Sequence, residues 1–435
     1  MSSKKFFIMD LIGAGNKGDI AILESEVQEL RRLFPNCTIT VIASYPESIK
    51  SVIPDIDVYQ TIVNRPITSA DTKTSDRKSL MFKVYFVLYT AQMFFEFVLF
   101  TASVVAARLG LPLFYRSDII KRFNEADLVI KTGGEEYKEG SNFLSNYAFS
   151  KQKVGWWLTL FRAMCIAILT GKIFKKSYVM FPCTIGPIRT KIGKFLIKQA
   201  LVPTNVIMTR DDFSGDTLKS LSIKNFIRTN DVALLLDRSE ISKNLLIPCH
   251  TIGVSPGLFD LNFNPELKEK YLCAHANVLD QLIETEKFNV VFLPSNLRED
   301  IKQTNDVAIS KMIIDKMRYK NCVRIITVND AKELQCILNQ LDLLVATRMH
   351  PMILAATQNV PFVSIIYDDK QLGFLSDMGL HVCSIKVWEI SQEKLQEKIT
   401  FVLRNSAEIR TGLQRKVSLL RNKTREAIDK VLCGL

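Results

Sequence analysis

The chain has 435 residues, of which 47% are hydrophobic, and carries a formal net charge of +12. These values exclude a disordered or fibrous chain and allow about two domains, each with its own apolar core. The positive charge predicts anionic partners, such as phosphorylated metabolites or an anionic membrane surface. We expect no nucleic-acid partner, because the basic residues are scattered and are not interleaved with aromatic residues.

The nine cysteines form no C-x-x-C pair and show no regular spacing. We therefore expect mostly buried thiols in a reducing compartment. The apolar N-terminal stretch runs straight into a glycine-rich loop without a cleavage site, so we expect a cytoplasmic protein. No group of histidine, cysteine and acidic residues has the spacing of metal ligands, and we expect no metal centre.

The first predicted elements are a strand at residues 6–11, a glycine loop and an amphipathic helix that stops at Pro35. The loop glycines, in the pattern G-x-G-x-x-G, are Gly13, Gly15 and Gly18. The pattern is typical of dinucleotide sites, but the second strand, TITVIAS, ends without the acidic residue that binds the ribose. Asp19 also places a carboxylate where the helix N-terminus would receive the pyrophosphate. We therefore expect no dinucleotide; a helix cap and a chemical role are equally supported for Asp19.

Two apolar segments, residues 84–107 and 156–174, approach the length of a membrane-spanning helix. Glu96 interrupts the first, and Arg162 and Lys172 interrupt the second, which makes spanning costly. Two alternatives remain open: helices buried between domains, or a patch that lies in the headgroup region of an anionic membrane. Basic residues that would assist the second alternative are Lys121, Arg122, Lys172, Lys175 and Lys176.

Short apolar runs alternate with amphipathic stretches through the first half of the chain. The further predicted strands are residues 127–134, 177–186, 205–210 and 230–236. This alternation predicts a parallel sheet covered by helices. We assign residues 1–240 to a first Rossmann-like domain on the acceptor side, with an apolar helical insertion at about 80–175.

A polar stretch at residues 237–250 separates a second series of the same kind, which ends near residue 390. Its strands are predicted at residues 251–256, 288–294, 323–327, 342–347 and 361–367. Its helices are predicted at residues 265–286, 304–318, 330–341 and 351–358. We assign residues 250–390 to a second domain and residues 391–435 to a charged helical segment. The predicted fold is α/β, with two doubly wound Rossmann-like domains that face each other across a cleft, as in type B glycosyltransferases.

The strongest group of polar residues lies in LLVATRMHPMILAATQNVPFVSIIYDDK, residues 343–370. Arg348 and His350 directly follow a predicted strand, at the carboxyl edge where open α/β sheets bind ligands. An arginine there can bind a carboxylate or phosphate, a histidine can transfer a proton, and Lys370 can hold a second anionic group. The alternatives are a structural ion pair for Arg348 and a helix cap for His350. We favour function, because His350 is the only one of four histidines paired with an arginine at a strand end.

R-x-H, a helix rich in alanine, a strand that begins with proline, and Y-D-x-K together resemble the signature of the polysaccharide pyruvyl transferase family. The N-terminal G-x-G-N-x-G-D-x-A-I-L, residues 13–23, is similar to the opening motif of that family. Between these motifs, the glycine pair Gly133 and Gly134, the segment TRDDFSGDTL and the run DVALLL match in order. The resemblance covers residues 5–385.

The resemblance implies transfer of an enolpyruvyl unit from phosphoenolpyruvate to a sugar of a cell-surface glycan precursor, with release of phosphate. Phosphoenolpyruvate would be the donor substrate, and no cofactor is expected. The expected acceptor is a sugar or a lipid-linked oligosaccharide. The apolar segments add the expectation of peripheral contact with the anionic inner face of the plasma membrane; the oligomeric state stays open.

We assign the expected site residues by role. His350 is the predicted acid, and Arg348 and Arg210, one in each domain, are the predicted clamp on the donor. Asn16 and Asp19 are predicted to orient or deprotonate the acceptor hydroxyls from across the cleft. Further predicted substrate-binding residues are Lys370, Gly15, Gly18, Gly133 and Gly134. For Arg210, a pair with Asp211 or Asp212 is an equal alternative.

Two positions depart from the family pattern. Glu135 stands where relatives commonly have a third glycine, and Asn296 stands where many have a histidine. Two other hypotheses stay open, and the departures motivate the second of them. One is a nucleotide-sugar glycosyltransferase of the same fold, and the other is a non-catalytic member of a polysaccharide assembly complex.

Overall fold

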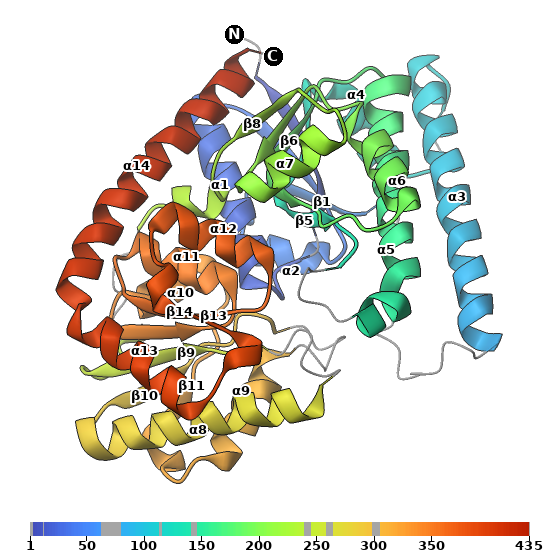
Figure 1. Cartoon of the computed structure of the whole chain (residues 1–435). Helices are drawn as coiled ribbons and strands as arrows, with labels where there is room; N and C mark the ends of the chain where they lie inside the picture. Colours follow the sequence, from blue (N-terminus) through green and yellow to red (C-terminus); the bar gives the residue numbers. More distant parts are fainter. Residues whose placement is uncertain are drawn as a thin grey trace. The chain divides into compact units, whose positions relative to one another are not determined.

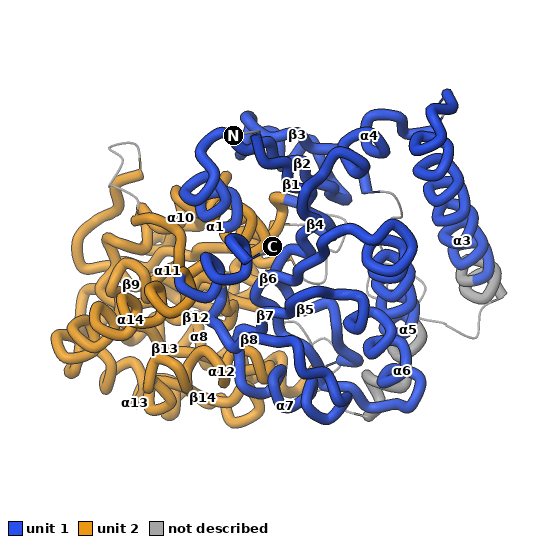
Figure 2. Tube along the Cα trace, turned by 90° about the horizontal axis from the view of Figure 1, so that it is seen from above, with its two compact units in different colours: residues 1–13, 26–231, 426–435 blue, residues 14–25, 232–425 orange. Residues whose placement is uncertain are grey.

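The computed structural model describes residues 3–11, 13–61, 80–112, 115–140, 146–238, 245–257, 264–297 and 305–434, without the side chains of residues 80–86 and 146–154 (Figure 1). The chain forms two compact units, coloured in Figure 2. Unit 1 contains residues 1–13, 26–231 and 426–435, and unit 2 contains residues 14–25 and 232–425. Both units are discontinuous in sequence, whereas the predicted domains are contiguous. The reason is that helices α1 (Lys17–Leu33) and α14 (Ser406–Cys433) each contribute residues to both units.

Unit 1 is built on a sheet with strand order β3-β2-β1-β4-β6-β7-β8, and β5 also pairs with β6. All of these pairings are parallel. The strands are β1 (Lys5–Leu11), β2 (Thr38–Ala43), β3 (Asp57–Gln60), β4 (Leu128–Lys131), β5 (Gly134–Tyr137), β6 (Tyr178–Ile185), β7 (Val206–Thr209) and β8 (Phe226–Arg228). The strands β1, β2, β4, β6 and β7 have the apolar, mostly buried sequences expected of a parallel sheet covered on both faces, whereas β3, β5 and β8 are only partly buried.

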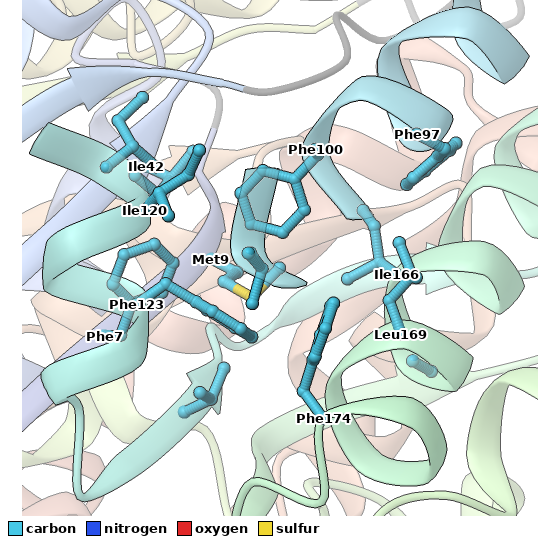
Figure 3. Packing of buried hydrophobic residues seen from close by; sticks show 14 of the residues in the cluster. Phe7, Met9, Ile42, Phe97, Phe100, Ile120, Phe123, Ile166, Leu169 and Phe174 are labelled. Carbon is cyan, nitrogen blue, oxygen red and sulfur yellow. The ribbon is translucent and has the colours of Figure 1, made fainter. Parts of the chain in front are cut away.

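The connections of unit 1 are mostly helical. The helices are α2 (Pro46–Lys50), α3 (Leu80–Arg108), α4 (Ser117–Glu125), α5 (Asn146–Ala167) with its π-helical extension η1 (Ile168–Ile173), α6 (Lys191–Leu201) and α7 (Asp212–Ser220). One core cluster joins α3, α4 and α5 to the strands, and Phe123 lies at its centre (Figure 3). The Phe123 ring packs edge-on against Phe7, Phe100 and Phe174, at centroid distances of 5.5, 5.5 and 5.8 Å. This packing fixes one face of α3 on the sheet.

Two helices, Val87–Arg108 and Gly155–Ile173, are long and apolar enough to cross a membrane by length and composition alone. In the second, Arg162 is buried, and its Nη2 lies 2.7 Å from Asp10 Oδ1 at the end of β1. Arg162, one of the two charges that interrupt this apolar segment, therefore belongs to the interior of unit 1, whereas Lys172 is exposed. The ion pair fixes one side of the helix in unit 1, and 39% of the apolar window is buried.

Unit 2 is built on a six-stranded parallel sheet of order β11-β10-β9-β12-β13-β14. The strands are β9 (Thr251–Ser255), β10 (Asn289–Phe292), β11 (Val323–Ile325), β12 (Leu343–Ala346), β13 (Phe362–Ile366) and β14 (Ser384–Lys386). The helices are α8 (Pro265–Glu286), α9 (Asp306–Lys316), α10 (Ala331–Leu338), α11 (Met349–Thr357), α12 (Asp369–Met378) and α13 (Gln392–Arg404), with short 3₁₀ turns at Lys320–Cys322, His381–Cys383 and Val387–Glu389. The predicted order of strands and helices between residues 251 and 367 is confirmed.

The strand predicted at residues 230–236 is wrong. Val232–Leu235 forms a 3₁₀ helix, η2, whose residues are all buried and which packs against α11. A short continuous apolar run has the same appearance in a buried strand and in a buried helical turn, so periodicity could not separate them.

A buried carboxyl group in unit 1 gives a pH-dependent prediction. Burial raises the pKa of Glu26 from 4.5 to about 7, although the Gly133 N–H and the Thr132 hydroxyl donate to the carboxyl group. The folded state therefore binds this proton more tightly than the unfolded state does. The protonated Glu26 contributes to the free energy of unfolding at low pH, and this contribution is lost as the pH rises from about 4.5 to about 7. At about pH 8, Glu26→Gln should raise the free energy of unfolding by on the order of 2–3 kcal/mol.

Urea unfolding at about pH 5 and about pH 8 measures this effect. The gain should shrink at the lower pH, and the exposed control Glu47→Gln should change stability little at either pH. An equal gain from Glu26→Gln at both pH values would show that titration of Glu26 is not its cause.

Candidate functional site

The carboxyl edge of the second sheet brings together the ends of four neighbouring strands. In register, Phe292 lies beside Val254, Ser255 lies beside Ala346, and Ala346 lies beside Ser364. The segments that follow these strands therefore leave the sheet at the same edge. They carry Ser295 and Asn296, Gly257, Arg348, and Tyr367 to Lys370. This is the edge at which open α/β sheets bind ligands.

Arg348 immediately precedes α11 and pairs with Asp306, the first residue of α9. Arg348 Nη2 lies 2.5 Å from Asp306 Oδ1, and Arg348 Nε lies 3.1 and 3.2 Å from the two carboxylate oxygens. Gly257 makes room for the guanidinium, because a Cβ atom there would lie 2.9 Å from Arg348 Nε. The structural ion pair that was the alternative for Arg348 is therefore present. Burial raises the pKa of Asp306, and the pair with Arg348 limits that rise.

Asp306 also fixes the backbone that follows β10. Its Oδ2 accepts the N–H groups of Ser295 and Asn296 at 3.1 and 2.8 Å. This stretch pairs in turn with the N-terminal glycine loop: Lys17 N–H donates to Ser295 O at 2.8 Å, and Leu297 N–H donates to Gly15 O at 2.7 Å. The Arg348–Asp306 pair thus holds the loop at residues 295–297 against the start of α1.

Gly18 in α1 lies directly against the His350 ring. A Cβ atom on Gly18 would lie 2.1 Å from His350 Nδ1, so no other residue fits there without displacing the ring. His350 is the second residue of α11 and is half-buried. The third glycine of G-x-G-x-x-G therefore allows the helix to approach a histidine.

This contact predicts a large effect of a single methyl group. Gly18→Ala should displace the His350 ring, lower the melting temperature and cost about 1–3 kcal/mol through overpacking. Gly412 of α14 is the matched control, because nothing lies within 4 Å of its Cβ position and helix propensity favours alanine there. Thermal unfolding of both variants tests the contact. A Gly18→Ala protein as stable as Gly412→Ala would contradict it.

Lys370 reaches the same edge from the first turn of α12. It is buried, and its Nζ lies 5.5 Å from the centre of the Tyr367 ring. Gln371 ties this turn to the end of β12: its Nε2 donates to Thr347 O at 3.0 Å, and its Oε1 accepts Tyr367 N–H at 2.8 Å. Lys370 and Arg348 are thus held at the ends of two adjacent strands.

The structure corrects the predicted placement of Asn16 and Asp19. Residues 14–25 belong to unit 2, together with Arg348 and His350, and not to the acceptor-side domain. Asn16 caps α1, because its Oδ1 accepts Gly18 N–H at 3.0 Å. Asp19 is therefore not the cap; it is a half-buried residue of the first turn, next to the glycine that His350 contacts.

Sequence reasoning missed Asp306, which pairs with Arg348, and two charged residues of α1, the buried Lys17 and the half-buried Glu24. Lys17 Nζ donates to Asn329 O at 2.8 Å and to Ala14 O at 3.1 Å, and burial lowers its pKa. Burial and the neighbouring Asp330 raise the pKa of Glu24 to about 7. Lys17 braces the glycine loop against the start of α10. No pattern in the sequence distinguishes these residues from ordinary helix-surface charges.

The remaining predicted site residues belong to unit 1. Arg210 is buried and pairs neither with Asp211 nor with Asp212: its Nη1 lies 2.6 Å from Asp231 Oδ2, and its Nε donates to Thr184 Oγ1 at 2.8 Å. Gly133 N–H donates to Glu26 at 2.8 Å, and Gly134 has a φ of +143° that favours glycine. The clamp formed by Arg210 and Arg348 stays a prediction.

Unit 2 therefore holds two cationic side chains and an imidazole at one sheet edge, beside the N-terminus of α1. Lys370 and the guanidinium of Arg348, which shares its charge with Asp306, can bind anionic groups at this edge, and the His350 imidazole at the start of α11 can deliver a proton. The positive end of the α1 dipole lies at this edge, but the Asp19 carboxylate in the first turn of α1 offsets it.

Comparisons with known proteins place the chain in a family. Residues 16–369 match the family described as polysaccharide pyruvyl transferase. The amylovoran biosynthesis protein AmsJ of Erwinia amylovora is 23% identical over 424 residues, which cover 93% of each chain.

Solved structures of similar fold include the HepE protein of Anabaena in complex with UDP and glucose, with a TM-score of 0.54, 10% identity and 100% of each chain covered. A UDP-GlcNAc 2-epimerase of Methanocaldococcus jannaschii, in complex with UDP-GlcNAc and UDP, has a TM-score of 0.53, 11% identity and 92% of each chain covered. At such identities the likeness shows the fold alone, and it confirms the two-domain Rossmann-like architecture of type B glycosyltransferases. Since the family match covers most of the chain, from the loop at Gly18 to the segment with Arg348 and His350, the protein belongs to the polysaccharide pyruvyl transferase family.

Proposed function

We propose that the protein transfers the pyruvyl group of phosphoenolpyruvate to a sugar of a cell-surface polysaccharide precursor. The observation that carries the proposal is the grouping of Arg348, His350 and Lys370 at one sheet edge, with His350 packed on Gly18. Phosphoenolpyruvate has a carboxylate and a phosphate, and Lys370 and Arg348, the latter paired with Asp306, are the cations that would bind these two groups. Membership of the family supports the same reaction class.

The chemistry assigns one role to each group. His350 delivers a proton to the methylene carbon of phosphoenolpyruvate, which leaves an oxocarbenium-like centre at the adjacent carbon. A sugar hydroxyl oxygen bonds to that carbon and gives up its proton; the carbon–oxygen bond to phosphate then breaks, and a second hydroxyl completes the ketal. Of the two protons that the hydroxyl groups release, one replaces the proton that His350 gave to the new methyl group, and the other ends on the released hydrogen phosphate. Arg348 and Lys370 stabilise the anions throughout.

The acceptor belongs to the same proposal. Asp19 follows the glycine that contacts His350, and we assign it the orientation or deprotonation of an acceptor hydroxyl. We propose a lipid-linked sugar as the acceptor and the inner face of the plasma membrane as the place of reaction, since the net charge of +12 favours an anionic surface.

Phosphate release tests the proposal. The protein is incubated with phosphoenolpyruvate and a panel of lipid-linked and free sugars, and inorganic phosphate and the mass of the sugar product are measured. Phosphate release that depends on the acceptor, with a pyruvylated product, is the expected result. Absence of both phosphate release and phosphoenolpyruvate binding would overturn it.

A second candidate is transfer of a sugar from a nucleotide sugar. It is favoured by the fold, because the similar structures from Anabaena and M. jannaschii were solved with UDP. We rank this candidate second, because Arg348, His350 and Lys370 suit a small substrate such as phosphoenolpyruvate, which carries two anionic groups and needs a proton donor. UDP- or GDP-sugars would raise the melting temperature if this candidate were correct, and phosphoenolpyruvate would not.

A further inference from the structure

We propose that one face of α3 docks on an anionic lipid bilayer, so that the protein lies on the membrane without crossing it. This surface, named here the α3 apolar face, consists of Val87, Leu88, Phe94, Phe95, Val98 and Val105. The inference goes beyond the proposed reaction, since it concerns a surface of unit 1 that none of the residues assigned to catalysis above shares.

The α3 apolar face is exposed over several turns. The side chains are exposed by 62% at Val87, 63% at Leu88, 66% at Phe94, 61% at Phe95, 48% at Val98 and 45% at Val105. Between residues 87 and 107, every exposed residue of the helix is uncharged. Apart from Gln92, the exposed residues of this stretch are apolar, and an exposed apolar surface of this kind indicates an interaction site.

The other side of α3 is fixed in the core of unit 1. The buried residues, at helical spacing, are Tyr89, Met93, Phe97, Phe100 and Val104. Figure 3 shows Phe97 and Phe100 directed into the cluster that contains Phe123 and Phe174. A spanning orientation would strip these residues from their core, at the cost of their buried apolar area. The geometry therefore points to a helix that lies in the interface.

Glu96 does not interrupt the α3 apolar face. It is the one charged residue of the helix between residues 87 and 107, and its side chain is 20% exposed. The Tyr115 hydroxyl donates to the Glu96 carboxylate, and Arg116 Nη2 lies 3.9 Å from it. Burial raises the pKa of Tyr115 to about 12, so the phenol stays protonated as the donor. The carboxylate is thus paired at the flank of the helix, beside the exposed face.

Basic residues gather where α3 ends. Arg108 donates to Phe174 O at 3.0 Å, which brings the end of α3 next to the exposed Lys172 and Lys175. Exposed apolar side chains of the same region are Leu109, Leu111 and Ile173. Exposed cations beside exposed apolar side chains are complementary to anionic headgroups above an acyl region. A second copy of this chain would instead bring two chains of charge +12 together.

A second helix of unit 1 exposes both apolar and basic residues. α5 packs against both α3 and α6, and α6 exposes Ile192 and Phe195. The other exposed residues of α6 are Lys191, Lys194 and Lys198. Alternation of apolar and basic residues on an exposed helix is typical of helices that bind anionic membranes.

Vesicle co-sedimentation tests the proposal on the full chain. Wild-type protein should bind vesicles of phosphatidylcholine with about one third phosphatidylglycerol, bind pure phosphatidylcholine several-fold less, and be released by high salt. Phe94→Ser/Phe95→Ser should lower the affinity for anionic vesicles about tenfold or more. Lys172→Gln/Lys175→Gln should lower it several-fold. Leu419→Ser is the matched control, because Leu419 is 61% exposed on α14, and it should bind like wild type.

Melting temperatures and phosphate release on a free sugar should be unchanged in all of these variants. A loss of vesicle binding can therefore be distinguished from a failure of the proposed reaction. The proposal is overturned if wild-type protein ignores anionic vesicles or if Phe94→Ser/Phe95→Ser binds like Leu419→Ser. Bound protein that resists high salt would indicate insertion and would also overturn it. A stable dimer that Phe94→Ser/Phe95→Ser dissociates would assign the face to a second copy instead.

Discussion

His350→Gln should lower kcat for phosphate release by about 10²–10⁴-fold, the usual contribution of a positioned general acid. Glutamine roughly keeps the volume against Gly18 but cannot deliver a proton to the methylene carbon. Phosphoenolpyruvate binding should be retained, because the cations Arg348 and Lys370 are unchanged. Steady-state phosphate release and phosphoenolpyruvate titration measure the two effects separately.

His381→Gln is the control for His350→Gln. His381 is exposed and lies in a 3₁₀ turn of the same unit. Its replacement should leave kcat unchanged. If His350→Gln reacted as fast as His381→Gln, His350 would not be the acid.

Asp306→Ala should destabilise the protein by about 3–5 kcal/mol, because it leaves the buried Arg348 guanidinium without its carboxylate. It also removes the acceptor for the Ser295 and Asn296 N–H groups, which position the segment paired with Gly15 and Lys17. Activity should therefore fall together with stability. Urea unfolding gives the free energy, and phosphate release gives the activity.

Two further variants test whether the loss of stability comes from the pair between Asp306 and Arg348. Asp315→Ala, at an exposed position of the same helix, should change the free energy of unfolding by less than about 0.5 kcal/mol. The double variant Asp306→Leu/Arg348→Met should recover the part of the lost stability that comes from the unpaired guanidinium, without recovering activity, since an apolar pair can replace a buried ion pair but cannot accept the Ser295 and Asn296 N–H groups. If Asp306→Ala were as stable as Asp315→Ala, the pair would not hold this edge together.

Much of the second unit could be predicted, because short stretches of its sequence, such as apolar strands and helix starts, already indicate the elements that the fold contains. The helix α8 has the bounds predicted for it, residues 265–286, and the structure shows the local cause: Asn264 caps it and Pro265 begins it. Arg348, His350 and Lys370 follow apolar strands, and parallel pairing brings strand ends to one edge.

The rest depends on contacts between distant segments. Asp306 meets Arg348 across 42 residues of sequence, and an acidic residue at a helix start looks like an ordinary partner of the helix dipole. The glycine loop was placed in the first domain because β1 precedes it, but Lys17 and Gly15 pair with the segment at residues 295–297. Sequence spacing carries no information on that pairing.

The central claim is that the cations at the second sheet edge bind phosphoenolpyruvate. The most direct test compares the rise in melting temperature that phosphoenolpyruvate, UDP-sugars and GDP-sugars cause in the wild type and in Lys370→Gln. We predict that phosphoenolpyruvate stabilises the wild type, that Lys370→Gln loses most of this shift, and that nucleotide sugars cause none. Stabilisation by a nucleotide sugar and not by phosphoenolpyruvate would contradict the claim.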